Sequence, residues 1–328
     1  MKSKRLELFF ILVFLLLAGL LLSLLVGPVP TRVHHLWNFI FHHDQTYAPI
    51  FITLRLSRAL LALLVGASLS LSGAILQGYF QNPMAGPFVV GVSSGASLGA
   101  VLAIFIGLNF QLFGFSLQSI FAFASGFALV YFVYLLSQRS GAFKVETLLL
   151  TGIAAGALAS SLTSFFIFLK SDSFQQAVFW LLGSFSLADW SQIAVIAPYF
   201  VLCLLGAQWL AKDMNLLVLG DEAAQSLGCS VKRVRKFFLA LSTLLAASAV
   251  SVSGIIGFVG LIIPHLIRLL IGPDHRYLFF FSCLAGGVFL VYSDLVARTI
   301  LFPTELPIGI ITAGIGAPFF IYLLNQRR

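Results

Sequence analysis

The feature that most limits the fold of this 328-residue chain is a run of 80 residues, from Ala59 to Gln138, without a single Asp, Glu, Lys or Arg. One helix needs only about 20 consecutive apolar residues to cross a membrane, so this run must contain several spans. Charged residues make up 9% of the chain and the mean hydropathy is +1.04, whereas soluble domains carry about 25% charged residues. The composition excludes a soluble domain and predicts a membrane protein with many spans.

Apolar runs separated by glycine, proline, asparagine or charged residues predict an all-α fold with about ten transmembrane helices. The uncharged stretch from Phe237 to Ile267 is long for one span and short for two, and its SGIIGF segment at 253–258 leads us to expect two. The apolar core that follows MKSKR is too long for a signal peptide, so we expect an uncleaved first span. The predicted spans are 7–27, 56–77, 90–107, 117–137, 147–169, 190–211, 236–254, 258–271, 278–297 and 306–325.

The basic residues indicate the orientation, because lysine and arginine gather on the cytoplasmic side of membrane proteins. With ten spans and a cytoplasmic N-terminus, 14 of the 19 basic residues fall inside the cell, so both termini are expected there. The net charge of +8 thus reports membrane topology, and we expect no nucleic-acid partner. The inner set is Lys2, Lys4, Arg5, Arg139, Lys144, Lys212, Lys232, Arg233, Arg235, Lys236, Arg268, Arg276, Arg327 and Arg328, and the outer set is Arg32, Arg55, Arg58, Lys170 and Arg298.

A short motif occurs twice at an offset of 181 residues. The SLSG motif at 70–73, followed by Pro83, returns as SVSG at 251–254, followed by Pro264. By the predicted topology the first copy starts outside and the second inside, which favours an inverted internal repeat with halves of about 55–170 and 235–325, a transporter architecture. The alternative is coincidence, since small residues are common in membrane helices.

The segment LGDEAAQSLG at 219–228 is short, polar and acidic, and it lies within a predicted cytoplasmic segment of about 213–232. Asp221 and Glu222 place carboxylates at the positive end of a helix, and Gly228 suits its C-terminal stop. An ordinary capped loop helix is one interpretation. The other is a docking element for a cytoplasmic partner.

No GxxxxGK[ST] pattern, which would cradle nucleotide phosphates, occurs in the sequence, so any ATP chemistry must come from another subunit. Few acidic residues lie inside the spans, and Asp294 is the clearest of them. Proton-coupled transport relies on such residues, so the sequence disfavours it. The spans also show no cluster of His, Asp or Glu at ligand spacing, as a membrane enzyme would need. A transporter driven by a separate ATPase is therefore preferred over a secondary transporter, and the chain is not expected to be an enzyme.

Four long motifs resemble the FecCD family, the membrane permeases of ABC importers for iron-siderophores, haem and vitamin B12. The likeness runs from about residue 50 to the C-terminus and implies one permease domain, 1–328, in a bacterial inner (cytoplasmic) membrane. It also implies a homodimer or a heterodimer with a homologous permease, two ABC ATPase subunits that bind ATP and Mg²⁺, an external substrate-binding protein, and no cofactor in this chain. The motifs are RLSRALLALLVGASLSLSGAILQGYFQNPMAGPFVVGVSSGASLGA (55–100), LGDEAAQSLG (219–228), GFVGLIIPHLIRLLIGPDHR (257–276) and ELPIGIITAGIGAPFFIYLL (305–324).

The resemblance also implies roles for three groups of residues. Arg55, Arg58 and Arg298 match arginines that receive acidic residues of the binding protein, the alternative being arginines that snorkel to the membrane surface. Asn82 and Met84 match the asparagine and leucine of a cytoplasmic gate, although Glu146 departs from the other half of that gate and receives no role. The ATPase-coupling element is carried onto Gly220, Asp221, Glu222, Ala223, Ala224, Gln225, Ser226, Leu227 and Gly228.

The substrate is expected to be an iron(III)-siderophore-type chelate, with vitamin B12 and haem open as alternatives. His34, His35, His42 and His43 gather in an outer loop and could suggest iron capture, since imidazole suits iron. Interface-seeking aromatic residues around them favour a membrane-surface segment instead. Cys203, Cys229 and Cys283 show no CxxC spacing and are expected to have no redox or metal role.

Overall fold

The computed structural model describes residues 2–27, 29, 31, 33–42, 45–107, 111–112, 115–138 and 145–325. Arg32, His43, Arg139, Lys144, Arg327 and Arg328, which the sequence analysis names, lie outside these residues. The first half contains α1 (Lys2–Leu25), α2 (Val33–Phe41), the short helices η1 (Gln45–Tyr47) and η2 (Pro49–Leu56), α3 (Ser57–Tyr79), α4 (Val92–Ile106), the strands β1 (Gln111–Leu112) and β2 (Phe115–Ser116), α5 (Leu117–Gln138) and α6 (Val145–Leu169). The second half contains η3 (Ser171–Ser173), α7 (Phe174–Leu182), α8 (Trp190–Trp209), α9 (Ala211–Leu217), α10 (Asp221–Ser226), α11 (Val231–Ser253), α12 (Val259–Ile271), α13 (His275–Ala297) and α14 (Ile308–Asn325).

Each of the ten predicted spans corresponds to a helix: α1, α3 to α6, α8 and α11 to α14. Seven helical segments of the described chain are long and apolar enough to cross a membrane, and α4, α12 and α14 are shorter apolar helices. The expected break near 253–258 is present, because α11 ends at Ser253 and α12 begins at Val259. The prediction of an all-α multi-pass membrane fold is confirmed, and the described residues add one antiparallel pair of short strands, β1 and β2.

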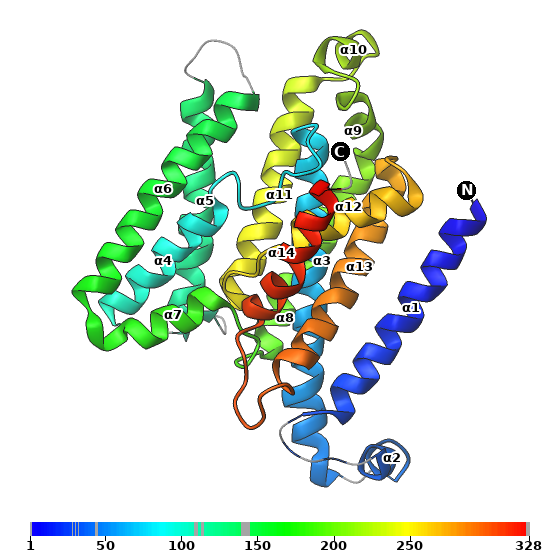
Figure 1. Cartoon of the computed structure of the whole chain (residues 1–328), viewed down its shortest axis with the longest axis vertical. Helices are drawn as coiled ribbons and strands as arrows, with labels where there is room; N and C mark the ends of the chain where they lie inside the picture. The colour runs from blue at the N-terminus through cyan, green and yellow to red at the C-terminus, as the bar shows by residue number, and fades with distance from the viewer. Residues whose placement is uncertain are drawn as a thin grey trace.

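Helix α3 forms the centre of the fold. It packs against α11, α12 and α13, while α4, α5 and α6 lie together on one flank and α1 contacts α13 at the opposite edge (Figure 1). Glycines allow this close packing: a Cβ at Gly73 would lie 1.7 Å from the carbonyl oxygen of Gly260, and one at Gly66 would lie 2.2 Å from that of Gly286. Small residues bring helix backbones together in this way throughout membrane proteins.

The molecule has two distinct ends along its helices. Helix α10 lies at one end, where the N- and C-terminal marks also lie, and α2 lies at the other (Figure 1). We refer to them as the α10 end and the α2 end. Because α3, α11 and α13 run between these ends, they can connect groups at one end to groups at the other.

The two copies of the repeated motif occupy different structural positions. Gly73 lies inside α3, whereas Gly254 follows the last residue of α11. Pro83 lies in the irregular segment after α3, whereas Pro264 lies inside α12. The motif therefore does not mark equivalent places in the two halves, and the inverted repeat stays a prediction.

Candidate functional site

The LGDEAAQSLG segment forms the short helix α10 at the exposed end of the molecule. Gly220 and Gly228 flank it with φ angles of 103° and 86°, a region of backbone space that favours glycine. Asp221 and Glu222 lie in its first turn, at the positive end of the helix dipole. The amide of Cys229 donates to the carbonyl of Ala224 at 2.9 Å and closes the helix at its C-terminal end. The sequence prediction of a short helix bounded by glycine is confirmed.

A buried arginine ties α10 to the central helix. Arg235, on α11 and only 5% exposed, donates from Nη2 to Oδ1 of Asp221 at 2.5 Å. Its Nη1 donates to the main-chain carbonyl of Tyr79, the last residue of α3, at 2.9 Å. A charge-assisted hydrogen bond of this kind is about twice as strong as a neutral one. One side chain thus links α10 to both α3 and α11.

Helix α9 is fixed to the neighbouring spans by a second set of contacts. Gln81 Nε2 donates to the carbonyl of Leu217 at 2.6 Å, and Asn215 Nδ2 donates to Asp274 Oδ1 at 2.8 Å. The amide of His275, the first residue of α13, donates to Asn215 Oδ1 at 2.9 Å. Hydrogen bonds from Arg276 first, and then from Asn215, lower the pKa of Asp274, which keeps this carboxylate charged as an acceptor. Hydrogen bonds therefore connect α9 and α10 to α3, α11 and α13, so these helices would move together.

Sequence reasoning did not identify these connecting residues. Arg235 counted only as one of several cations at the membrane surface, and Asp274 only as part of a family motif. The contacts of Arg235 join residues 14 and 156 positions apart, so no local spacing could reveal them. A weak signal was available for Asp274, which precedes α13 and accepts a hydrogen bond from the Arg276 amide, as N-cap residues do.

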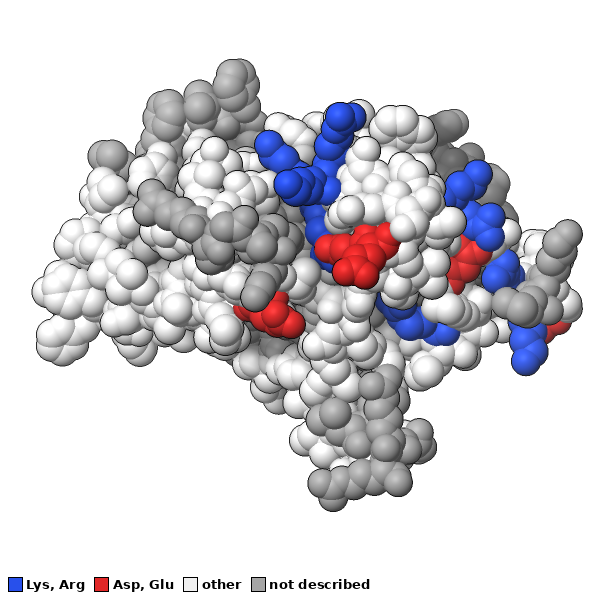
Figure 2. Space-filling model, turned by 90° about the horizontal axis from the view of Figure 1, so that it is seen from above, with Lys and Arg blue, Asp and Glu red and all other residues white. Residues whose placement is uncertain are grey.

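The outer surface of α10 combines apolar and acidic side chains. Leu219 is 63% exposed and Leu227 61% exposed, while Ala224 on the inner face is fully buried. Viewed from this end, acidic side chains lie at the centre of the surface with basic side chains beside them (Figure 2). Two exposed leucines thus flank the acidic first turn of α10.

The residues of the expected gate lie in the turn that follows α3. Asn82 is exposed, Met84 is half-buried, and the Met84 amide donates to Asn82 Oδ1 at 2.9 Å. Gln81, directly before them, has a φ angle of 49° and reaches Leu217 of α9. The structure therefore places the turn beside the end of α9.

A four-residue charged cluster occupies the α2 end of α3 and α13. Arg58 donates from Nη2 to Oδ1 of Asp294 at 2.8 Å and from Nη1 to Oε2 of Glu305 at 2.8 Å. Arg298 approaches Asp294 from the next turn of α13, with Nε 3.7 Å from Oδ2. Asp294 is 1% exposed, and a buried carboxylate is stable in its charged form only when cations such as these two arginines compensate it.

The three arginines of the expected docking site differ in exposure. Arg55 and Arg298 are 4% and 3% exposed, whereas the Arg58 side chain is 12% exposed and its partner Glu305 28%. Arg55 donates to the carbonyls of Leu24 and Val29 and to the hydroxyl of Thr31, and so holds the chain that follows α1. The guanidinium of Arg58 is therefore the most accessible of the three.

Other candidate residues form no metal site in the described part of the chain, where no group of three or more His, Cys, Asp or Glu could hold an ion. His34 and His35 lie on α2, and the ring of His35 stacks on Tyr47 with centroids 4.3 Å apart. The three cysteines are free and buried. Glu146 is exposed at the start of α6.

The sequence profile of the FecCD transport family matches residues 15–326. A ten-span helical fold with this match defines its class: the chain belongs to the FecCD transport family, whose members are membrane permeases and not enzymes. The family predicted from the four motifs is thereby confirmed.

Similar proteins agree with this assignment. The cobalamin import system permease protein of Halobacterium salinarum is 44% identical over 288 residues, which cover 88% of this chain and 76% of that protein. The Fe(3+)-citrate import system permease protein of Bacillus subtilis is 37% identical over 328 residues, or 100% of this chain and 97% of that protein. Among solved structures, an inward-facing transporter assigned to the metal-chelate type of ABC transporter has a TM-score of 0.84 and 36% identity, covering 98% of this chain and 99% of that one.

Proposed function

We propose that this chain is the permease subunit of an ABC importer that carries an iron(III)-siderophore-type chelate from an external binding protein into the cytoplasm. Its family and the import-system names of its relatives support the proposal. The observation that carries it is α10, an exposed helix with apolar and acidic side chains that Arg235 holds against the central helix α3. In this proposal ATP and Mg²⁺ are bound by separate ATPase subunits, and the permease catalyses no bond chemistry.

The proposal orients the chain with its α10 end in the cytoplasm of a bacterial cell and its α2 end outside the inner membrane. Most basic residues at the described helix ends gather at the α10 end, in agreement with their cytoplasmic preference (Figure 2). Both termini then lie in the cytoplasm, and α10 faces the compartment that contains ATP.

Coupling follows from the contacts at the α10 end. The ATPase would contact Leu219, Glu222 and Leu227, and its movement would pass through Asp221 and Arg235 to α3 and α11. A short helix held on several sides moves as a rigid body with its partner. The turn with Asn82 and Met84, which Gln81 fixes to α9, would open or close the cytoplasmic end of the substrate path. That path would lie along the interface with a second permease, either a second copy of this chain or a homologous one.

The binding protein would dock at the α2 end, on the four-residue cluster together with Arg55. The two arginines and two carboxylates of the cluster balance in charge, so Arg55, which bonds main-chain carbonyls and the hydroxyl of Thr31, adds the excess positive charge. In this proposal an acidic residue of the binding protein replaces Glu305 at the Nη1 side of Arg58, because Glu305 is the more exposed of its two partners. Arg55 and Arg298 would act by adding positive potential from beneath the surface.

This exchange predicts opposite effects for two mild variants. Arg58→Lys keeps the charge but loses the planar fork that binds carboxylates in pairs, and the affinity for the binding protein should fall about tenfold. Glu305→Gln removes the internal competitor, and the affinity should rise severalfold. Surface plasmon resonance at low and high salt measures both, with Glu7→Gln at the opposite end as the control. If the wild-type chain and the three variants bound the binding protein equally well at low salt, Arg58 would not be part of the docking site.

The substrate class is tested by uptake in a strain that lacks this permease. Labelled ferric siderophore, haem and cobalamin are each supplied to cells with and without the chain. We expect uptake of a ferric siderophore to depend on the chain. If only cobalamin uptake or only haem uptake depended on the chain, that compound would be the substrate instead. Equal uptake of all three compounds with and without the chain would overturn the importer function.

A further inference from the structure

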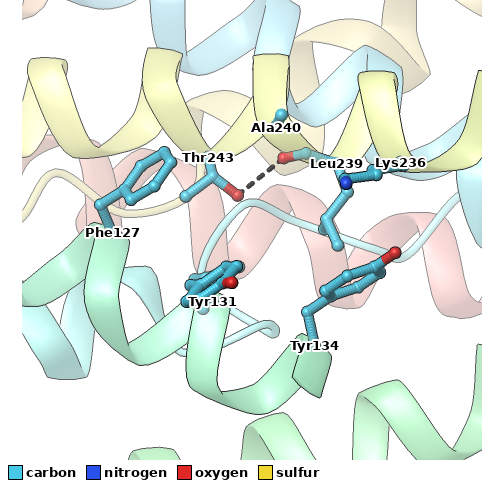
Figure 3. Close-up of a pocket in the computed structure, with 8 residues that line it drawn as sticks. Phe127, Tyr131, Tyr134, Lys236, Leu239, Ala240 and Thr243 are labelled. Atoms are coloured by element: carbon cyan, nitrogen blue, oxygen red, sulfur yellow. Dashed lines mark hydrogen bonds between the residues drawn. The ribbon is translucent and has the colours of Figure 1, made fainter. Parts of the chain in front are cut away.

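A furrow between α5 and α11 carries no role in the transport cycle described above. Figure 3 shows Tyr131 and Tyr134 of α5 facing Leu239 and Thr243 of α11 across a cavity of about 70 Å³. The hydroxyl of Thr243 donates to the carbonyl of Leu239 at 2.7 Å, so this polar group is already satisfied within its own helix. The furrow therefore suits an apolar occupant.

The apolar wall continues along α5 away from the α10 end. Phe127 stacks on Phe123 with ring centroids 6.4 Å apart, and Phe123 lines a further cavity of about 370 Å³ between α5, α8 and α11. The twelve residues from Phe123 to Tyr134 span about 16 Å of helix. One leaflet of a bilayer has a hydrocarbon thickness of about 15 Å, half of the membrane core. The aromatic face of α5 that borders both cavities is thus as long as one acyl chain.

At the α10 end the same furrow opens into a basic cavity of about 690 Å³. Tyr134 and Lys236 line both spaces, so the apolar and the basic parts are continuous. Four cations of α11 line the basic cavity, together with Asp221 as its one carboxylate: Lys232, Arg233, Arg235 and Lys236.

The charge of this cavity is not balanced within the described chain. Asp221 pairs with Arg235, and none of the ion pairs among the described residues involves Lys232, Arg233 or Lys236. All three are exposed side chains. The Nε of Arg235 is also buried without a hydrogen-bond acceptor among the described residues. The cavity therefore has an excess of donors and positive charge that fits an anion.

We propose that an anionic phospholipid binds in this furrow, with its phosphate at Lys232, Arg233 and Lys236 and an acyl chain along Phe127, Tyr131 and Leu239. Basic pockets between membrane helices on the cytoplasmic side bind acidic lipid headgroups in this manner. A free phosphate would satisfy the basic cavity but not the apolar furrow joined to it. A bound headgroup would lie beside the Asp221–Arg235 pair, at the link between the coupling helix and the spans.

The test is native mass spectrometry of the full chain, purified in detergent and titrated with palmitoyl-oleoyl phosphatidylglycerol or phosphatidylcholine. We expect the wild-type chain to retain phosphatidylglycerol at least about tenfold better than phosphatidylcholine. Lys232→Gln/Lys236→Gln should lose about tenfold in phosphatidylglycerol retention, because each lysine near the headgroup contributes measurably. The matched control is Lys4→Gln/Lys212→Gln, which removes two exposed lysines from the same end and should retain the lipid.

Ala240→Phe fills the furrow and should lower lipid retention without removing any charge. Competition with inorganic phosphate distinguishes the sources of the anion: millimolar phosphate should leave the bound phosphatidylglycerol in place. Displacement by phosphate would overturn the lipid site in favour of an anion site. Equal lipid retention by the two lysine double variants would also overturn the lipid site. If Lys232→Gln/Lys236→Gln retained the lipid but bound the ATPase more weakly, these lysines would belong to a protein contact instead.

Discussion

Replacing Asp221 and Glu222 by lysine should abolish ATP-driven transport while leaving the permease folded in the membrane. The change reverses the charge that α10 offers to its partner, and it places a cation against the buried guanidinium of Arg235. A hydrogen bond to a charged group contributes about 1.5–3 kcal/mol, so its loss alone weakens the attachment of α10 to Arg235 by about tenfold or more. The measurement is substrate uptake and ATP hydrolysis in proteoliposomes that contain the permease, its ATPase and the binding protein.

Single variants separate the two parts of this effect. Glu222→Lys changes the exposed surface but keeps the Asp221–Arg235 pair, whereas Asp221→Asn weakens the pair and keeps the surface otherwise intact. If force passes through Arg235, Asp221→Asn should retain ATPase binding but lower the uptake per ATP hydrolysed. Glu7→Lys, an exposed acid on α1, is the control for charge reversal. Wild-type uptake by the double lysine variant would return α10 to the status of an ordinary loop helix.

Replacing Asp294 by asparagine should cause the largest loss of stability among the charged residues of the spans. Asp294 is 1% exposed and is contacted by both Arg58 and Arg298. Removal of one partner from a buried ion pair typically costs about 3–5 kcal/mol, because the other charge stays buried without compensation. We expect a clear decrease in the thermal unfolding temperature of the purified chain, measured in one detergent.

Glu305→Gln is the matched control for this prediction, since it removes the second acid of the same cluster. Glu305 is 28% exposed, and pairs that reach solvent contribute only about 0–1 kcal/mol. An Asp294→Asn protein as stable as Glu305→Gln would show that the cluster is not what stabilises the α2 end.

The transmembrane helices could be predicted because the physical signal is local and strong. Uninterrupted apolar runs leave no alternative to a membrane helix. The segment 219–228 predicted α10 through a different local signal, carboxylates at the start of a helix and glycine at its end. Helices α2, α7 and α9 were not predicted, because at seven to nine residues they are too short to show a clear helical period in the sequence. The second span was predicted to start at 56, whereas η2 extends the helical segment back to Pro49.

The contacts within the candidate sites could not be predicted, because they join residues far apart in the chain. Arg58 and Asp294 are 236 positions apart, and the sequence treats them as a surface cation and an isolated acid of the membrane. Only the packing of α3 against α13 makes them partners. The same packing explains why Arg298, expected at the outer surface, is buried at the end of α13.

Uptake into proteoliposomes tests directly whether this chain is a permease driven by a separate ATPase through α10. Vesicles contain the permease with or without the ATPase, and uptake of the labelled chelate delivered by its binding protein is followed with ATP inside, in the presence and absence of vanadate. We expect uptake to require both the ATPase and ATP, and vanadate to stop it. Vanadate-insensitive uptake by the permease alone would contradict it and establish a secondary transporter.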